Sequence, residues 1–374
     1  MLDRIILFPY TIALALRGLR YRKGSSRVKK AEVPTVCVGN ITVGGTGKTP
    51  HTEFILRTLL ESDRWGAKNI AMLSRGYKRR SKGFQQVCLD DGAEFSGDEP
   101  LQIKKKYPLV TVAVDKDRLE GCSLLSDPSR LEGCKKARKC LHKDFPAADL
   151  IVLDDAFQYR ALAADLNVVL VDWNRPVTRD SLLPFGRLRD LPCRLGEADV
   201  VVVTKCPVFL EDGERAAFAA LLGYKTYDPE THAVTGRGGR VQTLLFSCMR
   251  HGRDIPVYET ADARYVYSQQ GILFSGIADD TPLVNYLSDR LKIVGRFNFP
   301  DHHTYSSSDV SRIASCVKRH PTAAVLTTQK DAQRILDYKG MPPELRERMF
   351  CIPIEVEFLS DAEKEHFQNI ITSL

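Results

Sequence analysis

The chain has 374 residues, of which 43% are hydrophobic and 27% charged, and its formal net charge at pH 7 is +7. This is the composition of a folded, soluble or peripheral protein that is long enough for two domains with hydrophobic cores. Its ten cysteines are scattered without a Cys-x-x-Cys pair, which argues against a disulfide framework or a zinc site and fits a reducing cytoplasm.

The N-terminal segment combines an apolar run with basic flanks. Residues 5–16 are mostly apolar and are bounded by Arg4 and Arg17, and residues 4–31 contain no acidic side chain. A bilayer-spanning helix needs about 20 apolar residues, and a signal peptide would end in small residues, so neither fits. We therefore predict that residues 1–24 form an amphipathic helix on a membrane surface with anionic headgroups; a buried packing helix is the alternative.

A glycine-rich turn follows the first strongly apolar run. Residues 34–39 predict a strand, and a helix-compatible stretch begins at Lys48. Backbone N–H groups of such a turn converge on an anion, and the lysine and the next hydroxyl serve the phosphates and Mg²⁺ of a nucleoside triphosphate. Thr42 stands where the usual loop has glycine. The residues predicted to bind ATP are Thr42, Val43, Gly44, Gly45, Thr46, Gly47, Lys48 and Thr49.

Apolar, β-branched runs alternate with helix-compatible segments along the rest of the chain. This pattern predicts an α/β fold of the P-loop NTPase type, with a wound, mostly parallel sheet and a second, smaller α/β domain. The alternating pattern weakens at 207–240 into a polar, glycine-containing stretch, which indicates a connection between two domains. We therefore predict domains at 25–225 and 226–374. The predicted strands are 34–39, 69–74, 109–114, 149–153, 167–171, 199–203, 271–275, 292–298, 323–327 and 351–357.

Several polar motifs add chemistry to this fold. Asp154 and Asp155 close a predicted strand, where a carboxylate can reach the Mg²⁺ of a bound nucleotide; helix capping is the alternative. Helix capping explains the two acids within 97–100, Asp98 and Glu99. The two histidines that follow Asp301 could accept a proton from a hydroxyl group. Arginines near glycine, such as Arg75, could bind phosphate or face solvent. The residues alone indicate a Mg²⁺-dependent P-loop enzyme at a membrane surface.

The same segments, in this order, resemble the tetraacyldisaccharide 4′-kinases, the lipid A 4′-kinases of Gram-negative bacteria. The resemblance runs from about residue 1 to 335, and a threonine at position 42 is typical of that family. The matching motifs are the loop 38–50, Ser74-Arg75-Gly76-Tyr77, Gly97-Asp98-Glu99-Pro100, Asp154-Asp155-Ala156-Phe157-Gln158, Leu182-Leu183-Pro184 with Leu188-Arg189, and Asp301-His302.

The resemblance implies transfer of the ATP γ-phosphoryl group to the 4′-hydroxyl of a tetraacylated glucosamine disaccharide 1-phosphate, giving lipid IVA. It implies ATP and Mg²⁺ as cofactors, a lipid acceptor, and no nucleic acid or obligate protein partner. It also implies a peripheral or monotopic enzyme on the cytoplasmic face of the inner membrane, whose C-terminal domain closes over the active site.

The resemblance also implies roles for single residues. Lys48 would hold the phosphates, and Asp98 would be the catalytic base, assisted by His302. The implied metal ligands are Thr49, Asp154, Asp155 and Asp190. The implied substrate-binding residues are Arg75, Gln158 and Arg189. The chain departs from the family's usual Gly, His and Glu at Ala156, Tyr159 and Asp190.

Two other functions share the phosphate loop and the paired acids. A regulatory P-loop NTPase would hydrolyse nucleotide to switch a protein partner and would not need a lipid-facing N-terminus. A nucleotide-gated basic scaffold would bind nucleic acid or anionic membrane, and Lys48→Ala would spare its main function.

Overall fold

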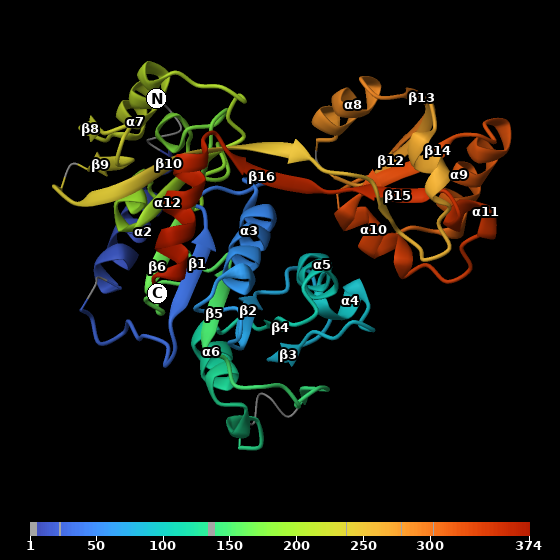
Figure 1. The fold of residues 1–374 in the computed structure, drawn as a ribbon. Helices are drawn as coiled ribbons and strands as arrows, with labels where there is room; N and C mark the ends of the chain where they lie inside the picture. The colour runs from blue at the N-terminus through green and yellow to red at the C-terminus, as the bar shows by residue number, and fades with distance from the viewer. Residues whose placement is uncertain (1–5, 22–23, 134–138, 237, 278, 302) are drawn as a thin grey trace.

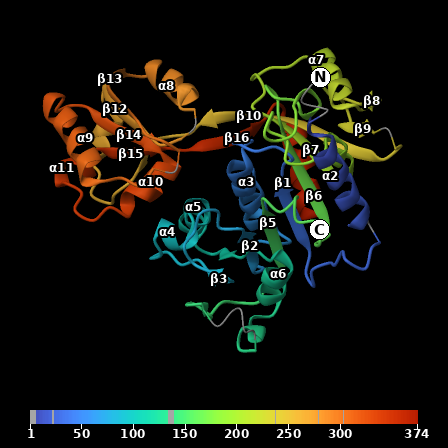
Figure 2. The same cartoon turned by 180° about the vertical axis from the view of Figure 1, so that it is seen from behind.

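The protein consists of two α/β domains joined by a pair of strands, in the computed structural model shown in Figure 1. Figure 2 shows from behind that helix α2 (Phe8–Arg20) lies on the outside of the large domain, away from the small one. No helix of the described part of the chain is long and apolar enough to cross a membrane. The structure describes residues 6–21, 24–133, 139–236, 238–277, 279–301 and 303–374.

The large domain is built on one wound sheet. Its strands are β1 (Thr35–Gly39), β2 (Ile70–Ser74), β3 (Gln85–Gln86), β4 (Thr111–Val114), β5 (Leu150–Asp154), β6 (Leu166–Asp172), β7 (Val200–Thr204), β8 (Thr226–Tyr227), β9 (Ala233–Thr235), β10 (Val241–His251) and β16 (Ile354–Phe358). Their order is β3-β4-β2-β5-β1-β6-β7-β10-β9-β8, and β16 pairs with β10. Pairs from β4 to β10 along this order are parallel, which confirms the predicted sheet.

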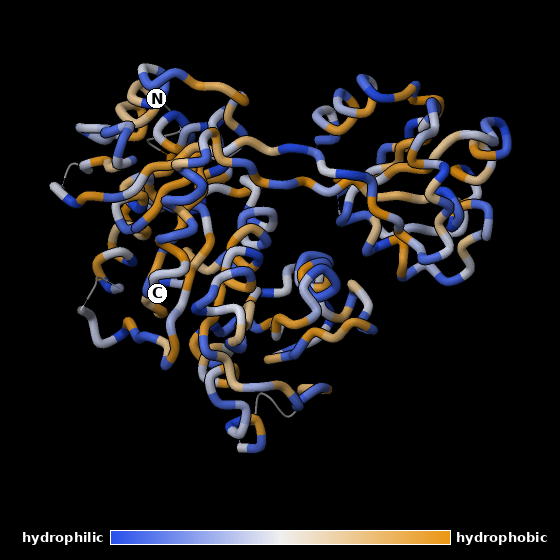
Figure 3. The backbone as a smooth tube through the Cα atoms, viewed as in Figure 1, coloured by the Kyte–Doolittle hydropathy of each residue, from blue (hydrophilic) through white to orange (hydrophobic). Residues whose placement is uncertain are grey.

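The apolar runs form strands because helices or loops cover both faces of this sheet. In β5, Leu150 and Val152 join one buried cluster, whereas Ile151 and Leu153 join the cluster on the opposite face. Successive side chains of a strand point to opposite faces, so a strand buried on both sides reads as continuously apolar. Figure 3 shows the hydrophobic colour concentrated along the strands.

Helices of the large domain pack on these faces. The α-helices are α3 (Lys48–Glu61), α4 (Ala93–Ser96), α5 (Asp98–Lys106), α6 (Arg118–Ser126), α7 (Asp212–Leu222) and α12 (Asp361–Thr372), with short 3₁₀ turns η1 (Pro128–Leu131), η3 (Val177–Arg179) and η4 (Pro192–Glu197). Phe54 of α3 lies 5.3 Å from the ring of Phe358 and 5.9 Å from that of Phe367. This aromatic group holds α3, which follows the glycine-rich loop, against the C-terminal helix.

The small domain has its own sheet, in the order β11-β15-β14-β12-β13. Its elements are β11 (Ile255–Pro256), η5 (Ala263–Tyr267), β12 (Gln270–Ser275), α8 (Thr281–Ser288), β13 (Lys292–Asn298), α9 (Ser307–Arg319), β14 (Ala324–Thr328), α10 (Gln329–Leu336), α11 (Pro343–Arg346) and β15 (Met349–Ile352). Leu283 of α8 packs on one face of this sheet and Ile313 of α9 on the other. The strands predicted at 271–275, 292–298 and 323–327 are confirmed.

The domain boundary differs from the one predicted at residue 225. Residues 243–246 of β10 pair with β7 inside the large sheet, and residues 247–251 pair antiparallel with β16. The small domain therefore lies between these two strands, at residues 252–353, and the chain then returns to the large domain. The stretch predicted as a connection holds α7 and the hairpin β8–β9. Short, half-exposed antiparallel strands give a weak apolar pattern, which explains the difference.

Candidate functional site

The glycine-rich loop connects β1 to α3 at the carboxyl edge of the sheet. Gly44 and Gly47 have φ angles of 106° and 85°, which glycine adopts without the steric cost of a side chain. The buried Asn40 amide holds the loop from inside, because its Nδ2 donates to Thr46 Oγ1 at 2.7 Å and to Thr42 Oγ1 at 3.4 Å. Thr42, which departs from the usual glycine, therefore has a structural partner. The loop leaves the first N–H groups of α3 available to an anion.

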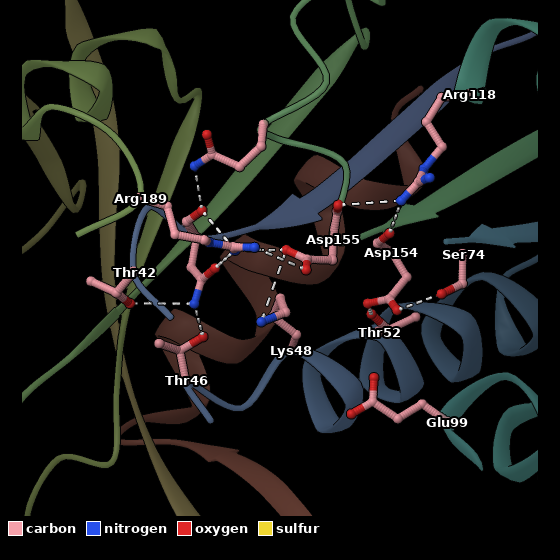
Figure 4. A network of polar contacts seen from close by, with 12 residues as sticks. Thr42, Thr46, Lys48, Thr52, Ser74, Glu99, Arg118, Asp154, Asp155 and Arg189 are labelled. Carbon is pink, nitrogen blue, oxygen red and sulfur yellow. Dashed lines mark hydrogen bonds and ion pairs between the residues drawn. The ribbon is translucent and has the colours of Figure 1, made fainter. Parts of the chain in front are cut away.

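Lys48 begins α3 and lies beside the acid at the end of β5 (Figure 4). Its Nζ is 3.9 Å from Asp155 Oδ1, and Arg189 donates to both oxygens of the same carboxylate, at 2.9 and 3.3 Å. Burial alone would raise the pKa of Asp155, but Lys48 and Arg189 outweigh it and hold that pKa below its usual range. Asp155 is therefore an anion that keeps two cations beside the loop.

Asp154 has different surroundings. Its carboxylate accepts hydrogen bonds from the hydroxyls of Thr52, at 3.4 Å, and Ser74, at 3.2 Å. Burial, followed by the charges of Glu99 and Asp155, raises the pKa of Asp154 to about 7. Figure 4 shows Glu99 pointing toward this carboxylate from α5. A buried carboxylate that contacts hydroxyls rather than a cation has the chemistry of an unfilled cation ligand.

Arg118 was not among the predicted site residues. Its buried guanidinium donates to the backbone carbonyl of Asp115 at 2.7 Å and lies 3.4–3.5 Å from the carbonyls of Asp154 and Asp155. It thus supports the turn that presents both acids, including Asp155 with its left-handed φ of 48°. A lone arginine at the start of α6 gives no sequence signal for this role.

Two ion pairs join the small domain to α5. Arg334 of α10 donates to Asp98 Oδ2 through its Nε, at 3.2 Å, and through a shorter contact from its NH2 group. One turn earlier in α10, Lys330 pairs with Glu99. Both partners of the Arg334–Asp98 pair have side chains only 8% exposed. The acid predicted as the base is therefore held in a buried contact between the domains.

The predicted partner of Asp98, His302, lies outside the described residues. Gly276, which lies next to the described residues Pro300 and His303, accepts a hydrogen bond from Arg334 through its carbonyl at 3.0 Å. A methyl group placed on Gly276 would lie 3.2 Å from the carbonyl oxygen of Pro300 and 3.4 Å from Cβ of His303. The pairing of Asp98 with His302 stays a prediction.

Asp190 has a different environment from the other predicted metal ligands. Both of its oxygens accept from Arg160 NH2, at 2.8 and 2.7 Å, and Arg194 lies 3.5 Å away. The carboxylate is fully buried in this cluster, whereas the preceding Arg189 faces Asp155. Asp155 also pairs with a guanidinium on both oxygens, but it is 31% exposed beside the loop, whereas Asp190 is enclosed between two arginines. The geometry therefore favours a structural role for Asp190 over the predicted metal role.

The predicted substrate-binding residues occupy different places. Gln158 donates to the carbonyl of Asn40 at 3.1 Å and Arg189 contacts Asp155, so both lie under the phosphate loop. Arg75 follows β2 and is exposed. Tyr159, which stands at the family's usual histidine position, donates to Asp117 Oδ1 at 2.8 Å.

The described residues contain no group of three or more His, Cys, Asp or Glu side chains that could hold a metal ion. Mg²⁺ in phosphoryl-transfer sites is held by one or two carboxylates together with the phosphates themselves. The site therefore contains the groups that a nucleotide–Mg²⁺ complex needs: a loop and a lysine for the phosphates, and the Thr49 hydroxyl and the Asp154 carboxylate for the ion.

Comparisons with known proteins agree over the whole chain. A family model described as tetraacyldisaccharide-1-P 4′-kinase matches residues 4–373. Tetraacyldisaccharide 4′-kinases of Parabacteroides distasonis and Phocaeicola vulgatus are 35% and 33% identical, over 97% of this chain and 91% and 92% of their own. The crystal structure of the "apo" form of LpxK from Aquifex aeolicus in complex with ATP is similar with a TM-score of 0.68 and 26% identity, covering 100% of this chain and 99% of that chain.

Proposed function

The chain belongs to the tetraacyldisaccharide 4′-kinase family, and we propose that the site built around Lys48, Asp154 and Asp155 carries the family's reaction. The protein is an ATP-dependent kinase of lipid A biosynthesis that phosphorylates the 4′-position of a lipid disaccharide. The observation that carries the site assignment is the lysine after the glycine-rich loop, 3.9 Å from a strand-end acid. The matches give no support to a regulatory switch.

The acceptor is a tetraacylated glucosamine disaccharide 1-phosphate, and the product is lipid IVA. Its 4′-hydroxyl oxygen attacks the γ-phosphorus, the bond from that phosphorus to the oxygen bridging the β-phosphate breaks, and ADP leaves. Asp98 receives the hydroxyl proton, assisted by His302. Lys48 offsets charge on the phosphates, Arg189 keeps Asp155 in place, and Arg75 binds the acceptor from the exposed end of β2.

Mg²⁺ fits the donor set beside the loop. The buried Asp154 carboxylate accepts hydrogen bonds from the hydroxyls of Thr52 and Ser74, and Thr49 carries a buried hydroxyl at the start of α3. Thr49 and Asp154 would hold the ion, with Asp155 beside them. When bound, the ion neutralises charge on the phosphates.

Transfer of radiolabelled phosphate from ATP to the disaccharide 1-phosphate tests this function directly. The expected result is label in the lipid, at the 4′-position, with ADP formed in equal amount. ATP hydrolysis without labelled lipid would contradict the kinase assignment.

The raised pKa of Asp154 predicts a pH-dependent need for Mg²⁺. A carboxylic acid with a pKa of about 7 is mostly protonated at pH 6 and mostly ionised at pH 8, and only the ionised form binds the cation. The free Mg²⁺ concentration for half-maximal rate should therefore be about 10-fold higher at pH 6 than at pH 8. Residual activity of Asp154→Asn, which has no ionisable group there, should lack this shift; an equal shift in both proteins would exclude Asp154 as its source.

We also propose that α2 lies on the membrane surface. Phe8, Leu16 and Leu19 are 62%, 60% and 68% exposed, while Leu14 is buried against the large domain. Spacings of eight and three residues place the three exposed side chains on one face of a helix. Arg17 and Arg20 at the end of the helix favour anionic headgroups.

Replacing these three side chains by serine tests the membrane contact. Because each buried apolar side chain contributes about 1.5–3 kcal/mol, co-sedimentation with vesicles of anionic and neutral phospholipids should weaken at least about 10-fold. Leu109→Ser provides a matched control, because Leu109 is 89% exposed and lies outside α2, and it should not change sedimentation. Equal sedimentation of the triple variant and the control would favour a helix that only packs against the protein.

A further inference from the structure

The phosphate loop is fixed from behind by two buried polar side chains. Thr204 Oγ1 donates to the carbonyl of Thr46 at 3.0 Å, and His51 Nδ1 lies 2.8 Å from the carbonyl of Gly47. Thr204 and His51 are both 0% exposed. Two successive carbonyls of the loop therefore point away from the cradle. The carbonyl of Gly47 also accepts the backbone N–H of His51 at 3.2 Å, so the imidazole adds a second hydrogen bond to the same oxygen.

This anchoring determines where the loop's N–H groups point. In a planar trans peptide the C=O and the N–H point in opposite directions. Fixing the carbonyls of Thr46 and Gly47 therefore fixes the N–H groups of Gly47 and Lys48 on the other side, facing the cradle. Those N–H groups are donors that an α-helix leaves unpaired at its start, and a phosphate can accept from them.

His51 connects this loop to the strand that leaves the large domain. A carbonyl can only accept, so Nδ1 carries the proton, and Nε2 is left as an acceptor 3.2 Å from Ser247 Oγ. The Ser247 hydroxyl also lies 3.3 Å from the carbonyl of Val203. Burial lowers the pKa of His51 to about 4, which keeps the ring neutral at pH 7, as this arrangement requires. Ser247 is the residue at which the pairing of β10 with β16 begins.

A second residue of β10 lies against the same peptide. A methyl group placed on Gly47 would be 2.1 Å from Cε of Met249, so this side chain covers the space beside the loop glycine. The phosphate loop thus rests on Ser247, through His51, and on Met249. Both residues belong to the part of β10 that leads to the small domain.

We propose that His51 is a positioning residue that fixes the Gly47–Lys48 peptide for phosphate binding and ties it to β10 through Ser247. The inference rests on the proposed binding of ATP by this loop. It assigns His51 no contact with the reacting atoms. It predicts that the affinity for ATP depends on a side chain at the base of the interdomain strands.

Two substitutions of His51 separate its two hydrogen bonds. His51→Asn keeps an amide N–H near the position of Nδ1, whereas His51→Gln moves that group to the position of Nε2. In the transfer assay with the full chain, His51→Gln should raise the KM for ATP about 10-fold, and His51→Asn should stay within about 3-fold of wild type. Both should leave kcat at saturating ATP within about 3-fold, because the loop binds phosphates equally before and during transfer.

Ser247→Ala tests the connection to β10. It should raise the KM for ATP about 3-fold, and His51→Gln combined with Ser247→Ala should be no worse than His51→Gln alone. Additive effects would contradict the connection. Equal KM values for His51→Asn and His51→Gln would show loss of packing instead of loss of a donor, and would overturn the proposal.

Controls keep the outcome interpretable. His320→Gln makes the same exchange at the end of α9 and should not change the KM for ATP. If the His51 variants fail to fold, Thr204→Val removes the matching anchor of the Thr46 carbonyl and should raise the KM about 10-fold; an unchanged KM there contradicts the anchoring. Wild-type protein that binds no Mg²⁺–ATP in calorimetry would instead refute the proposed function itself.

Discussion

Lys48→Ala is expected to lower the rate of lipid phosphorylation about 10³-fold or more. Phosphoryl transfer depends on charge stabilisation around the phosphates, and one cationic side chain supplied there, an arginine finger, is worth about 10³–10⁵-fold in rate. The structure gives Lys48 freedom to turn to the phosphates, because its 3.9 Å contact with Asp155 is long and Arg189 remains bound to that carboxylate. The measurement is kcat/KM for ATP in the radiolabel transfer assay.

Two variants control this result. Lys48→Arg keeps the charge but not the point-like ammonium, so it should lose less activity than alanine. Lys30→Ala makes the same exchange at an exposed ion pair with Asp165 and should leave the rate within about 2-fold of wild type. A Lys48→Ala protein with full turnover would exclude the loop as the phosphate site.

The parts of the site that could be predicted from sequence are those encoded locally. The loop before Lys48 and the acids after β5 each follow an apolar strand, and parallel strands bring their carboxyl ends to one edge. Strand positions followed from continuous apolar runs for the same reason, since helices cover both faces of the large sheet. The spacing of apolar residues was enough to predict these elements, because each one is determined by residues that are close together in the sequence.

Contacts between distant segments could not be predicted in this way. Arg334 and Lys330 meet the acids of α5 only because the chain leaves through β10 and returns through β16. Nothing in the local pattern around α10 indicates a partner in the large domain. His51 is a similar case, because a histidine inside a helix is informative only once Ser247 and the Gly47 carbonyl are seen on either side of its ring.

Asp190 shows how neighbours in sequence can separate in space. Arg189 and Asp190 are adjacent, yet Arg189 turns to Asp155 while Asp190 turns to Arg160 on the buried side. The resemblance implies a metal role for position 190 by its motif. The side-chain partners, which the motif does not contain, favour a structural ion pair.

Asp98→Asn is expected to lower kcat about 10²–10⁴-fold, the range for loss of a general base. The amide keeps the shape of the side chain and an oxygen that can accept from Arg334, but it cannot take up the proton of the 4′-hydroxyl. The KM for ATP should change little, because the phosphate loop is intact. The measurement is kcat at saturating ATP and lipid, with thermal unfolding to confirm a folded protein.

Arg334→Met decides whether Asp98 acts in chemistry or only holds the domains together. It breaks the same buried ion pair from the other side, and removing one partner of such a pair typically destabilises a protein by about 3–5 kcal/mol. If Asp98 were only a domain contact, Arg334→Met, which removes both the charge and the hydrogen-bond donor, would lose at least as much activity as Asp98→Asn. If Asp98 is the base, Arg334→Met keeps the carboxylate and frees it from a guanidinium that competes with the proton, so its kcat should stay at least about 10-fold above that of Asp98→Asn.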